Sequence, residues 1–264
     1  MRILNFLFSR SKQEQDKPIR DKLKTRKDFE RDLAEDLDIM ETTKARIDTA
    51  KNINLYTYRS LSYSYILILQ SKYSVDAKID ELRDIYIKSM HYFLQAFNKR
   101  NPIYADILNY VSLGVLLNIP DNNFRQLIDY VKQMDKQAKP SGWTPDLLLW
   151  FMLNSRMKEQ EKQKYAETLA YPRLYNGLYK VIQAPNAAAA KDALCKYLDR
   201  WYNLNSNAPW YNSHLKDNSY RGYWAWEVAA VAKIMHIDDS DLKNNQYYPY
   251  DMVHWADNET TAKE

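Results

Sequence analysis

Glycine is scarce in this sequence, which has only 4 glycines in 264 residues. Tight turns between strands usually need glycine, because most other residues rarely adopt a positive φ angle. The shortage therefore argues against a sheet-rich protein. It favours helices that are joined by loops of proline, asparagine and aspartate.

Cysteine is nearly absent as well. Cys195 is the only one, so the chain cannot form an internal disulfide. This composition suits a reducing compartment. A chain of 264 residues can bury a substantial core without disulfides or metals. We interpret Cys195 as a small buried side chain on a helix.

Long apolar runs are also missing. The N-terminal apolar patch, residues 3–8, is too short for the hydrophobic core of a signal peptide, and no small-residue cleavage site follows it. No apolar stretch approaches the ~20 residues that cross a bilayer. We therefore expect a cytoplasmic protein that does not bind membranes.

The net charge is small, +4, but it is unevenly spread. Residues 1–26 carry eight Lys or Arg against three acids. Residues 27–41 carry seven acids against two basic residues, and residues 236–264 repeat that ratio. Because the basic leader is followed at once by an acidic block, and no folded basic stripe is visible, we expect no direct binding of nucleic acid.

Apolar residues recur at helical spacing along most of the chain, which predicts an all-α fold. One stretch, residues 55–70, has a strand-like composition, but its length and its helical neighbours favour a buried helix. Thr144 is the expected N-cap of a later helix, with Pro145 and Asp146 in its first turn. The predicted helices span residues 20–53, 55–70, 76–98, 102–118, 122–136, 147–157, 162–183, 186–203, 220–236 and 249–255.

Proline and glycine meet at residues 139–142, the best internal boundary in the chain. The segment 115–124 also resembles 233–242, since each joins a helix end, an Ile, an acidic cap and an apolar residue. We therefore expect two packed multi-helix subdomains, with helical hairpins stacked as in an α-solenoid. The predicted divisions are a flexible leader at 1–17, helical domains at 18–138 and 139–256, and a disordered tail at 257–264.

Catalytic motifs are missing from the sequence. The four histidines, His91, His214, His236 and His254, are far apart, and no zinc-protease, CxxC, phosphate-loop or serine-hydrolase motif occurs. A metal site from His236 and His254 with Asp238 or Asp239 is the less favoured interpretation of that region. We expect no catalytic residues, no metal and no cofactor.

Glu227 is an acid on an otherwise apolar helix, so it must be paired or hydrogen-bonded if it is buried. It could be a general acid with a raised pKa. We favour an anchor for a neighbouring loop, through a tyrosine or Arg221. The 22 tyrosines and 7 tryptophans could stack on nucleic acid, but their helical spacing favours core and interface packing.

The segment 222–255 is the most distinctive part of the sequence. It resembles the immunity proteins of the PoNi type, which pair with PoNe-type DNase toxins of bacterial antagonism. The N-terminal half resembles the leading helical domain of that family through Arg20–Lys24 and the acidic helix that follows, so the resemblance covers about residues 18–256. The residues that carry it in the C-terminal segment are Tyr223, Trp224, Trp226–Ala230, Ile237–Ser240, Leu242 and Tyr247–Asp251.

The resemblance implies an all-helical, non-enzymatic cytoplasmic protein that binds a cognate DNase toxin and blocks it. Since a DNase presents a positive cleft to DNA, an inhibitor can compete by offering carboxylates there. The alternatives are a hydrolase that uses Glu227 with a histidine, and a general helical scaffold. The candidate contact residues are Asp238, Asp239, Asp241, Tyr247, Tyr248 and Asp251. The residues expected to be structural are Tyr223, Trp224, Trp226, Glu227, Pro249 and Tyr250.

Overall fold

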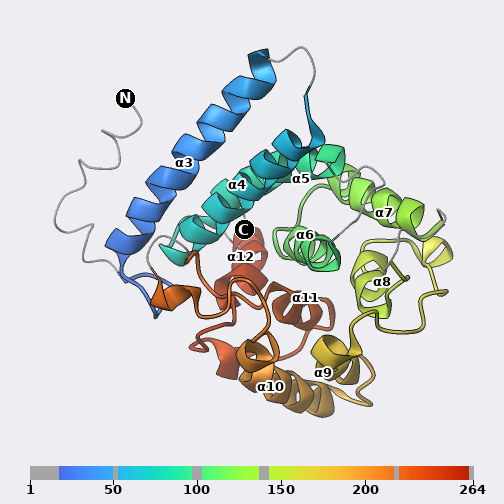
Figure 1. Ribbon diagram of the computed structural model, residues 1–264. Coiled ribbons are helices and arrows are strands. Elements are labelled where there is room, and N and C mark those ends of the chain that lie inside the picture. Colours follow the sequence, from blue (N-terminus) through green and yellow to red (C-terminus); the bar gives the residue numbers. More distant parts are fainter. Residues whose placement is uncertain (1–17, 50–52, 97–102, 137–142, 217–219, 262–264) are drawn as a thin grey trace. The chain divides into compact units, whose positions relative to one another are not determined.

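The protein is described by a computed structural model (Figure 1), which covers residues 18–49, 53–96, 103–136, 143–216 and 220–261, with side chains up to Trp255. Within these ranges every regular element is a helix, so the predicted all-α fold is confirmed. The α-helices are α3 (Arg26–Thr49), α4 (Leu55–Ser74), α5 (Ile79–Ala96), α6 (Tyr104–Leu116), α7 (Asp121–Lys136), α8 (Leu147–Asn154), α9 (Pro172–Ile182), α10 (Ala187–Leu204), α11 (Trp226–Ile234) and α12 (Tyr250–Thr261). The 3₁₀ helices are η1 (Glu159–Glu161), η2 (Ser213–Leu215) and η3 (Ser240–Leu242).

The chain divides into two compact units that differ from a sequential division at 138/139. Unit 1 contains residues 1–98 and 212–223, and unit 2 contains residues 99–211 and 224–264. The predicted leader (1–17) and the predicted boundary (139–142) lie outside the described residues. The division at 138/139 therefore stays a prediction. The sequence did not predict that residues 212–223 belong to unit 1.

In unit 1, α3 and α4 lie side by side (Figure 1). A buried cluster joins Leu33 and Met40 of α3 to Leu61, Tyr65 and Ile68 of α4. The interpretation of residues 55–70 as a helix is confirmed, because α4 spans Leu55–Ser74, but Leu55, Tyr56 and Tyr63 are exposed, so the helix is only partly buried.

In unit 2, α11 packs on α6 through side chains of small and medium size. Val228, Ala229, Ala230, Val231 and Ala232 of α11 are almost fully buried. Small residues let two helices approach closely, and a small residue has the same effect between α9 and α10. A Cβ atom at Gly177 of α9 would lie 2.3 Å from Tyr197 Cδ2 of α10, so only glycine fits there.

The two similar segments of the sequence, residues 115–124 and 233–242, contain two turns of the same kind in unit 2. Asn118 after α6 and His236 after α11 both have positive φ angles, of 44° and 51°. In each turn the following Ile donates its N–H to a carbonyl five residues earlier, from Ile119 to Gly114 and from Ile237 to Ala232. This pattern closes a helix C-terminus with a left-handed residue. The first turn leads into the α-helix α7, and the second leads only into the short helix η3.

Asp146, rather than Thr144, caps α8. The Asp146 side chain accepts a hydrogen bond from the Leu149 N–H at 2.8 Å. The same carboxylate accepts from the Tyr104 hydroxyl at 2.8 Å and from the Ala170 N–H at 2.7 Å. The predicted cap was wrong because two donors distant in sequence, the Tyr104 hydroxyl and the Ala170 N–H, also bind this buried carboxylate.

Several helix limits also differ from the prediction, and the helix expected at 20–53 spans only Arg26–Thr49. The helix expected at 162–183 begins at Pro172, and the one expected at 220–236 begins at Trp226. Gly222 has a φ of 107°, a value that glycine tolerates and a helix does not allow. The last helix continues to Thr261, beyond the start of the tail predicted to be disordered at 257–264. No helix in the described ranges is both long and apolar enough for a bilayer crossing.

Candidate functional site

Asp238 and Asp241, two of the candidate contact residues, are exposed and share one cation. The Nζ atom of Lys191, near the start of α10, lies 2.8 Å from Oδ2 of each aspartate. The hydrogen bond from Lys191 holds the pKa of Asp238 well below its usual range. The same bonds, first to Asp238 and then to Asp241, raise the pKa of Lys191. This acidic edge therefore carries one net negative charge instead of two.

Asp239 and Tyr248, by contrast, are buried. The Asp239 carboxylate accepts the Tyr248 hydroxyl at 2.7 Å, and its other oxygen lies 2.8 Å from His254 Nε2. A buried carboxylate is tolerated when donors satisfy it, and these two donors tie the segment before η3 to α12 and to Tyr248 just before that helix. Burial removes Asp239 and Tyr248 from the surface that we expected a partner to contact.

Tyr247 is half-buried in an aromatic stack at the end of α10. Its ring is nearly parallel to that of Tyr202, with the centroids 5.4 Å apart, and lies 5.5 Å from the ring of Trp201. Its carbonyl accepts the Ala225 N–H at 2.8 Å. Asp251, in the first turn of α12, is exposed. The exposed carboxylates of the contact set are thus those of Asp238, Asp241 and Asp251.

The residues expected to be structural lie mostly in the interior. Trp224, Trp226 and Pro249 are buried, and Tyr250 is half-buried with its ring 4.4 Å from that of His254. Tyr223 is buried in unit 1, where its hydroxyl accepts the His214 N–H at 3.0 Å and lies 3.1 Å from Ser213 Oγ. The distinctive segment 222–255 is therefore divided between the two units at Tyr223 and Trp224.

Glu227 is engaged by a tryptophan. It lies partly buried in the first turn of α11, and its Oε1 accepts the Trp201 Nε1–H at 2.6 Å. Burial raises the pKa of Glu227 to about 7, against the opposing effect of hydrogen bonds from its own backbone and from Trp201. After burial, the Glu227 charge is the next cause that raises the pKa of Tyr175 and of Tyr197, so the carboxyl lies near both rings. The partner suggested from the sequence, Arg221, binds two aspartates instead.

Glu227→Gln is expected to change how stability depends on pH. The folded-state pKa, about 7, lies above the ordinary value of 4.5, so the folded protein holds this proton more tightly than the unfolded chain does. The contribution of Glu227 to stability is therefore fully present below the unfolded pKa and is lost as the pH rises through about 7. Glutamine stays neutral at both pH 5 and pH 8. The free energy of unfolding of the variant relative to wild type should therefore be about 2 kcal/mol higher at pH 8 than at pH 5.

Urea unfolding at the two pH values measures this gain. Glu167→Gln, at an exposed acid of unit 2, is the matched control and should track wild type at both values. If the stability difference between Glu227→Gln and wild type were equal at pH 5 and pH 8, the assignment of a raised pKa would be wrong.

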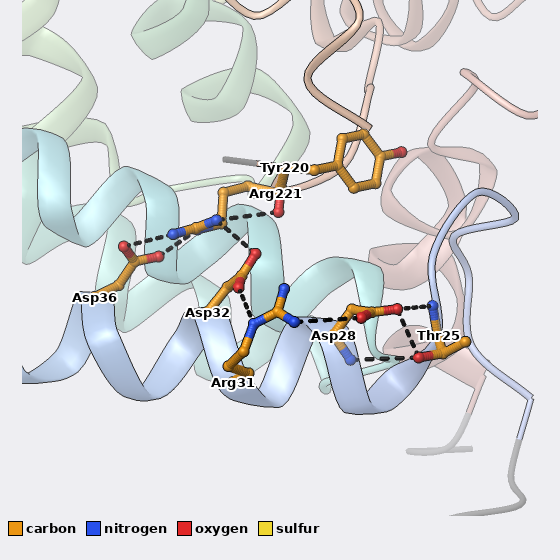
Figure 2. A network of polar contacts seen from close by, with 7 residues as sticks. All are labelled: Thr25, Asp28, Arg31, Asp32, Asp36, Tyr220 and Arg221. Carbon is orange, nitrogen blue, oxygen red and sulfur yellow. Dashed lines mark hydrogen bonds and ion pairs between the residues drawn. The ribbon is translucent and has the colours of Figure 1, made fainter. Parts of the chain in front are cut away.

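Arg221 forms a buried ion network with two aspartates of α3, as Figure 2 shows. Its Nε and Nη2 atoms lie 2.5 Å and 2.9 Å from the two carboxylate oxygens of Asp36. Its Nη1 atom lies 2.9 Å from Asp32 Oδ2. All three side chains are buried. The paired bonds to Asp36 are the bidentate geometry that guanidinium and carboxylate groups favour.

The network continues along α3 to the first turn of the helix (Figure 2). Arg31 Nε lies 3.0 Å from the second oxygen of Asp32, and Arg31 Nη1 lies 3.7 Å from Asp28. Hydrogen bonds from the Thr25 hydroxyl and N–H lower the pKa of Asp28. Positive and negative groups thus alternate from the buried Arg221 to the exposed helix end.

This network was not predicted from the sequence. Asp32 and Asp36 were counted as part of an acidic block, although they lie four residues apart on the side of α3 that also buries Phe29, Leu33 and Met40. Acids inside a buried stripe require a cation, and that spacing was the available signal. The position of the cation, 185 residues further along the chain than Asp36, follows from tertiary structure alone.

Three of the four histidines are used in separate contacts. His91 Nε2 lies 2.7 Å from Gln95 Nε2, His214 is bound to Tyr223, and His254 is bound to Asp239. Among the residues that the structure describes, no group of three or more His, Cys, Asp or Glu side chains is arranged to hold a metal ion.

Comparison with known proteins places this chain in a family. The model of the PoNe immunity protein (PoNi) N-terminal region matches residues 12–129, and the model of the PoNi C-terminal region matches residues 144–252. No curated protein matches the sequence significantly. The crystal structure of protein PA2201 from Pseudomonas aeruginosa is similar, with a TM-score of 0.70, 17% identity and 93% of each chain covered. At that identity the likeness shows the fold alone. Because the two family models together match most of its length, the chain belongs to the PoNe immunity protein (PoNi) family.

Proposed function

We propose that this protein binds and neutralises a cognate DNase toxin of the PoNe type that is delivered between bacteria. It does so by covering the DNA-binding or active-site cleft of the toxin. The observation that carries this proposal is the match of both PoNi family models, at residues 12–129 and 144–252. The partner is accordingly a protein, and we place the complex in the cytoplasm, where a nuclease reaches DNA.

Electrostatics supports the proposed mode of inhibition. A DNase cleft must be positive to hold DNA, so an inhibitor that covers it gains from exposed carboxylates. This chain has a net charge of +4, so the acidity must be local. Asp238, Asp241 and Asp251 are exposed carboxylates of unit 2, although Lys191 balances part of the charge of the first two.

Family membership favours an inhibitory role over a hydrolytic one. The contacts of the chain agree with this view, because Glu227 is engaged by Trp201 while His254 is engaged by Asp239. The carboxylates of Glu227 and Asp239 thus accept hydrogen bonds in the protein interior, which is the ordinary use of a polar group there. We propose that Glu227 and His254 do not form a catalytic pair.

Co-expression tests the function directly. Cells that produce the nuclease toxin encoded beside this gene should lose viability, and production of this chain in the same cells should restore it. An unrelated helical protein expressed at the same level is the control and should give no rescue. Continued killing, with both proteins present in soluble form, would contradict the proposal.

A further inference from the structure

Aromatic side chains of unit 2 gather around Tyr202, at the C-terminal end of α10. The centroid of the Tyr202 ring lies 4.5 Å from that of Tyr211, 5.4 Å from that of Tyr247 and 6.5 Å from that of Trp210. The buried ring of Trp201 lies 5.4 Å from the Trp210 ring and 5.5 Å from the Tyr247 ring. Since Tyr202 contacts three of these rings directly, they form one continuous cluster.

Four members of the cluster reach the surface. Trp201 is buried, whereas the other four are half-buried. We call these four the aromatic platform: Tyr202, Trp210, Tyr211 and Tyr247. Large aromatic side chains that gather at a surface mark a site of interaction, and tyrosine and tryptophan are the residues on which protein interfaces most often depend.

The aromatic platform comes from two uncharged stretches of the sequence. In a chain with 27% charged residues, residues 201–211 contain no charged residue, and residues 244–250 contain none either. Their exposed polar side chains include asparagines and a serine. A surface of tyrosine, tryptophan, asparagine and serine is typical of antibody paratopes, which bind other proteins. The exposed charges next to the two stretches within unit 2 are two of each sign: Asp199, Arg200, Lys243 and Asp251.

The backbone of both stretches is held by hydrogen bonds. The N–H groups of residues 205, 206, 208 and 211 donate to carbonyls three or four residues earlier. The Tyr247 N–H donates to Asn245 Oδ1 at 2.9 Å, and the Tyr247 carbonyl accepts the Ala225 N–H at 2.8 Å. Trp201 is bound to Glu227 of α11. A surface that is already ordered loses little conformational entropy when a partner binds.

The exposed carboxylates of unit 2 are a weaker anchor than the aromatic platform. Lys191 already binds both Asp238 and Asp241, so a basic cleft would have to approach or displace that cation. Ion pairs at the edge of an interface mainly change the rate of association, whereas desolvated aromatic side chains supply most of the affinity.

We propose that the aromatic platform is the principal anchor for the toxin. The proposal rests on the proposed function, and the occupant is an uncharged, apolar patch of the nuclease beside the cleft that holds DNA. Such a patch matches the platform because neither surface has to bury an unpaired charge. The rings supply affinity and slow dissociation, and the bound chain then covers the cleft.

Binding of the full-length chain to a catalytically inactive form of the nuclease encoded beside it tests the platform. Trp210→Ala with Tyr211→Ala should raise the dissociation constant about 30-fold or more, mainly through faster dissociation. The loss should be the same at low and at high salt, because the change removes no charge. Trp210→Phe with Tyr211→Phe keeps aromatic rings and should stay within about fivefold of wild type.

Two further variants serve as controls. Tyr56→Ala with Tyr63→Ala removes tyrosines of α4 that are 74% and 61% exposed, and should change the dissociation constant less than about threefold. Asn207→Glu leaves every ring in place and adds a carboxylate to the exposed loop that joins Tyr202 to Trp210. It should weaken binding more than about fivefold, because the charge meets an uncharged patch, whereas a basic cleft would bind it more tightly.

Circular dichroism shows which variants are folded, and Asn207→Glu decides alone if the alanine variant is not. Wild-type affinity in the folded alanine variant, a loss that disappears at high salt, or tighter binding by Asn207→Glu would overturn the assignment. So would a change of the free chain from dimer to monomer in the alanine variant with unchanged affinity for the toxin, since the platform would then join two copies. The absence of any complex with the wild-type chain would instead contradict the proposed function, so the two failures can be told apart.

Discussion

Replacing Arg221 with methionine is expected to lower the free energy of unfolding by about 3–5 kcal/mol. The guanidinium group is buried between Asp32 and Asp36, and its loss leaves two carboxylates in the interior without their cation. Burial alone would lower the pKa of Arg221, but the hydrogen bond and charge of Asp36, followed by the charge of Asp32, outweigh it and raise that pKa. The arginine therefore stays charged in the folded protein.

Two further variants separate the charge from the packing. Arg221→Lys keeps the charge but cannot make the paired bonds to Asp36, so its loss should be intermediate. Adding Asp32→Asn and Asp36→Asn to Arg221→Met removes the unpaired charges and should recover more than about 1 kcal/mol. Urea unfolding measures each value. Additive losses in the triple variant would show that the three residues do not form one network.

Asp146→Ala is expected to destabilise the protein by about 3 kcal/mol. The change removes the N-cap of α8, which contributes about 1 kcal/mol, and leaves the buried Tyr104 hydroxyl and the Ala170 N–H without their acceptor. Burial raises the pKa of Asp146, although three backbone N–H groups and the Tyr104 hydroxyl oppose this effect.

Thermal and urea unfolding measure the loss. The matched control is Asp199→Ala, at an exposed aspartate of α10, which should stay within about 0.5 kcal/mol of wild type. If the two alanine variants were equally stable, Asp146 would not be the residue that holds α8 to its surroundings.

The helices could be predicted from sequence because their signal is local. The buried residues of α5 and α7 recur at helical spacing, and each predicted segment overlaps its helix closely. The prediction of helices failed where a side chain binds a residue that is distant in sequence. Residues 220–225 were expected to be helical, but Tyr220 and Arg221 are held by the side chains of Asp21, Asp32 and Asp36.

The candidate site shows the same limit. Three aspartates near η3 indicated an acidic surface. However, Asp239 is buried, and Lys191 forms ion pairs with both Asp238 and Asp241. Lys191 and Asp238 are 47 positions apart, so no local sequence pattern predicts that they pair. Spacing indicates which residues share a helix face, whereas the partner of an exposed charge depends on which helices meet.

The composition of unit 1 does not follow the division between the two family models. Residues 212–223 belong to the stretch matched by the C-terminal family model, but they belong to unit 1 together with α3, α4 and α5. Tyr220 and Arg221 supply buried bonds to Asp21 and to α3 from that stretch. The two family models therefore do not correspond to the two compact units of this chain.

A nuclease assay with purified proteins tests the central claim most directly. The toxin is held at a fixed concentration with plasmid DNA, and this chain is added in steps. The account predicts that cleavage falls linearly to zero at one molar equivalent, and that a large excess of DNA competes with the inhibitor because both occupy the same cleft. Undiminished cleavage by a toxin that is saturated with this protein would contradict the account.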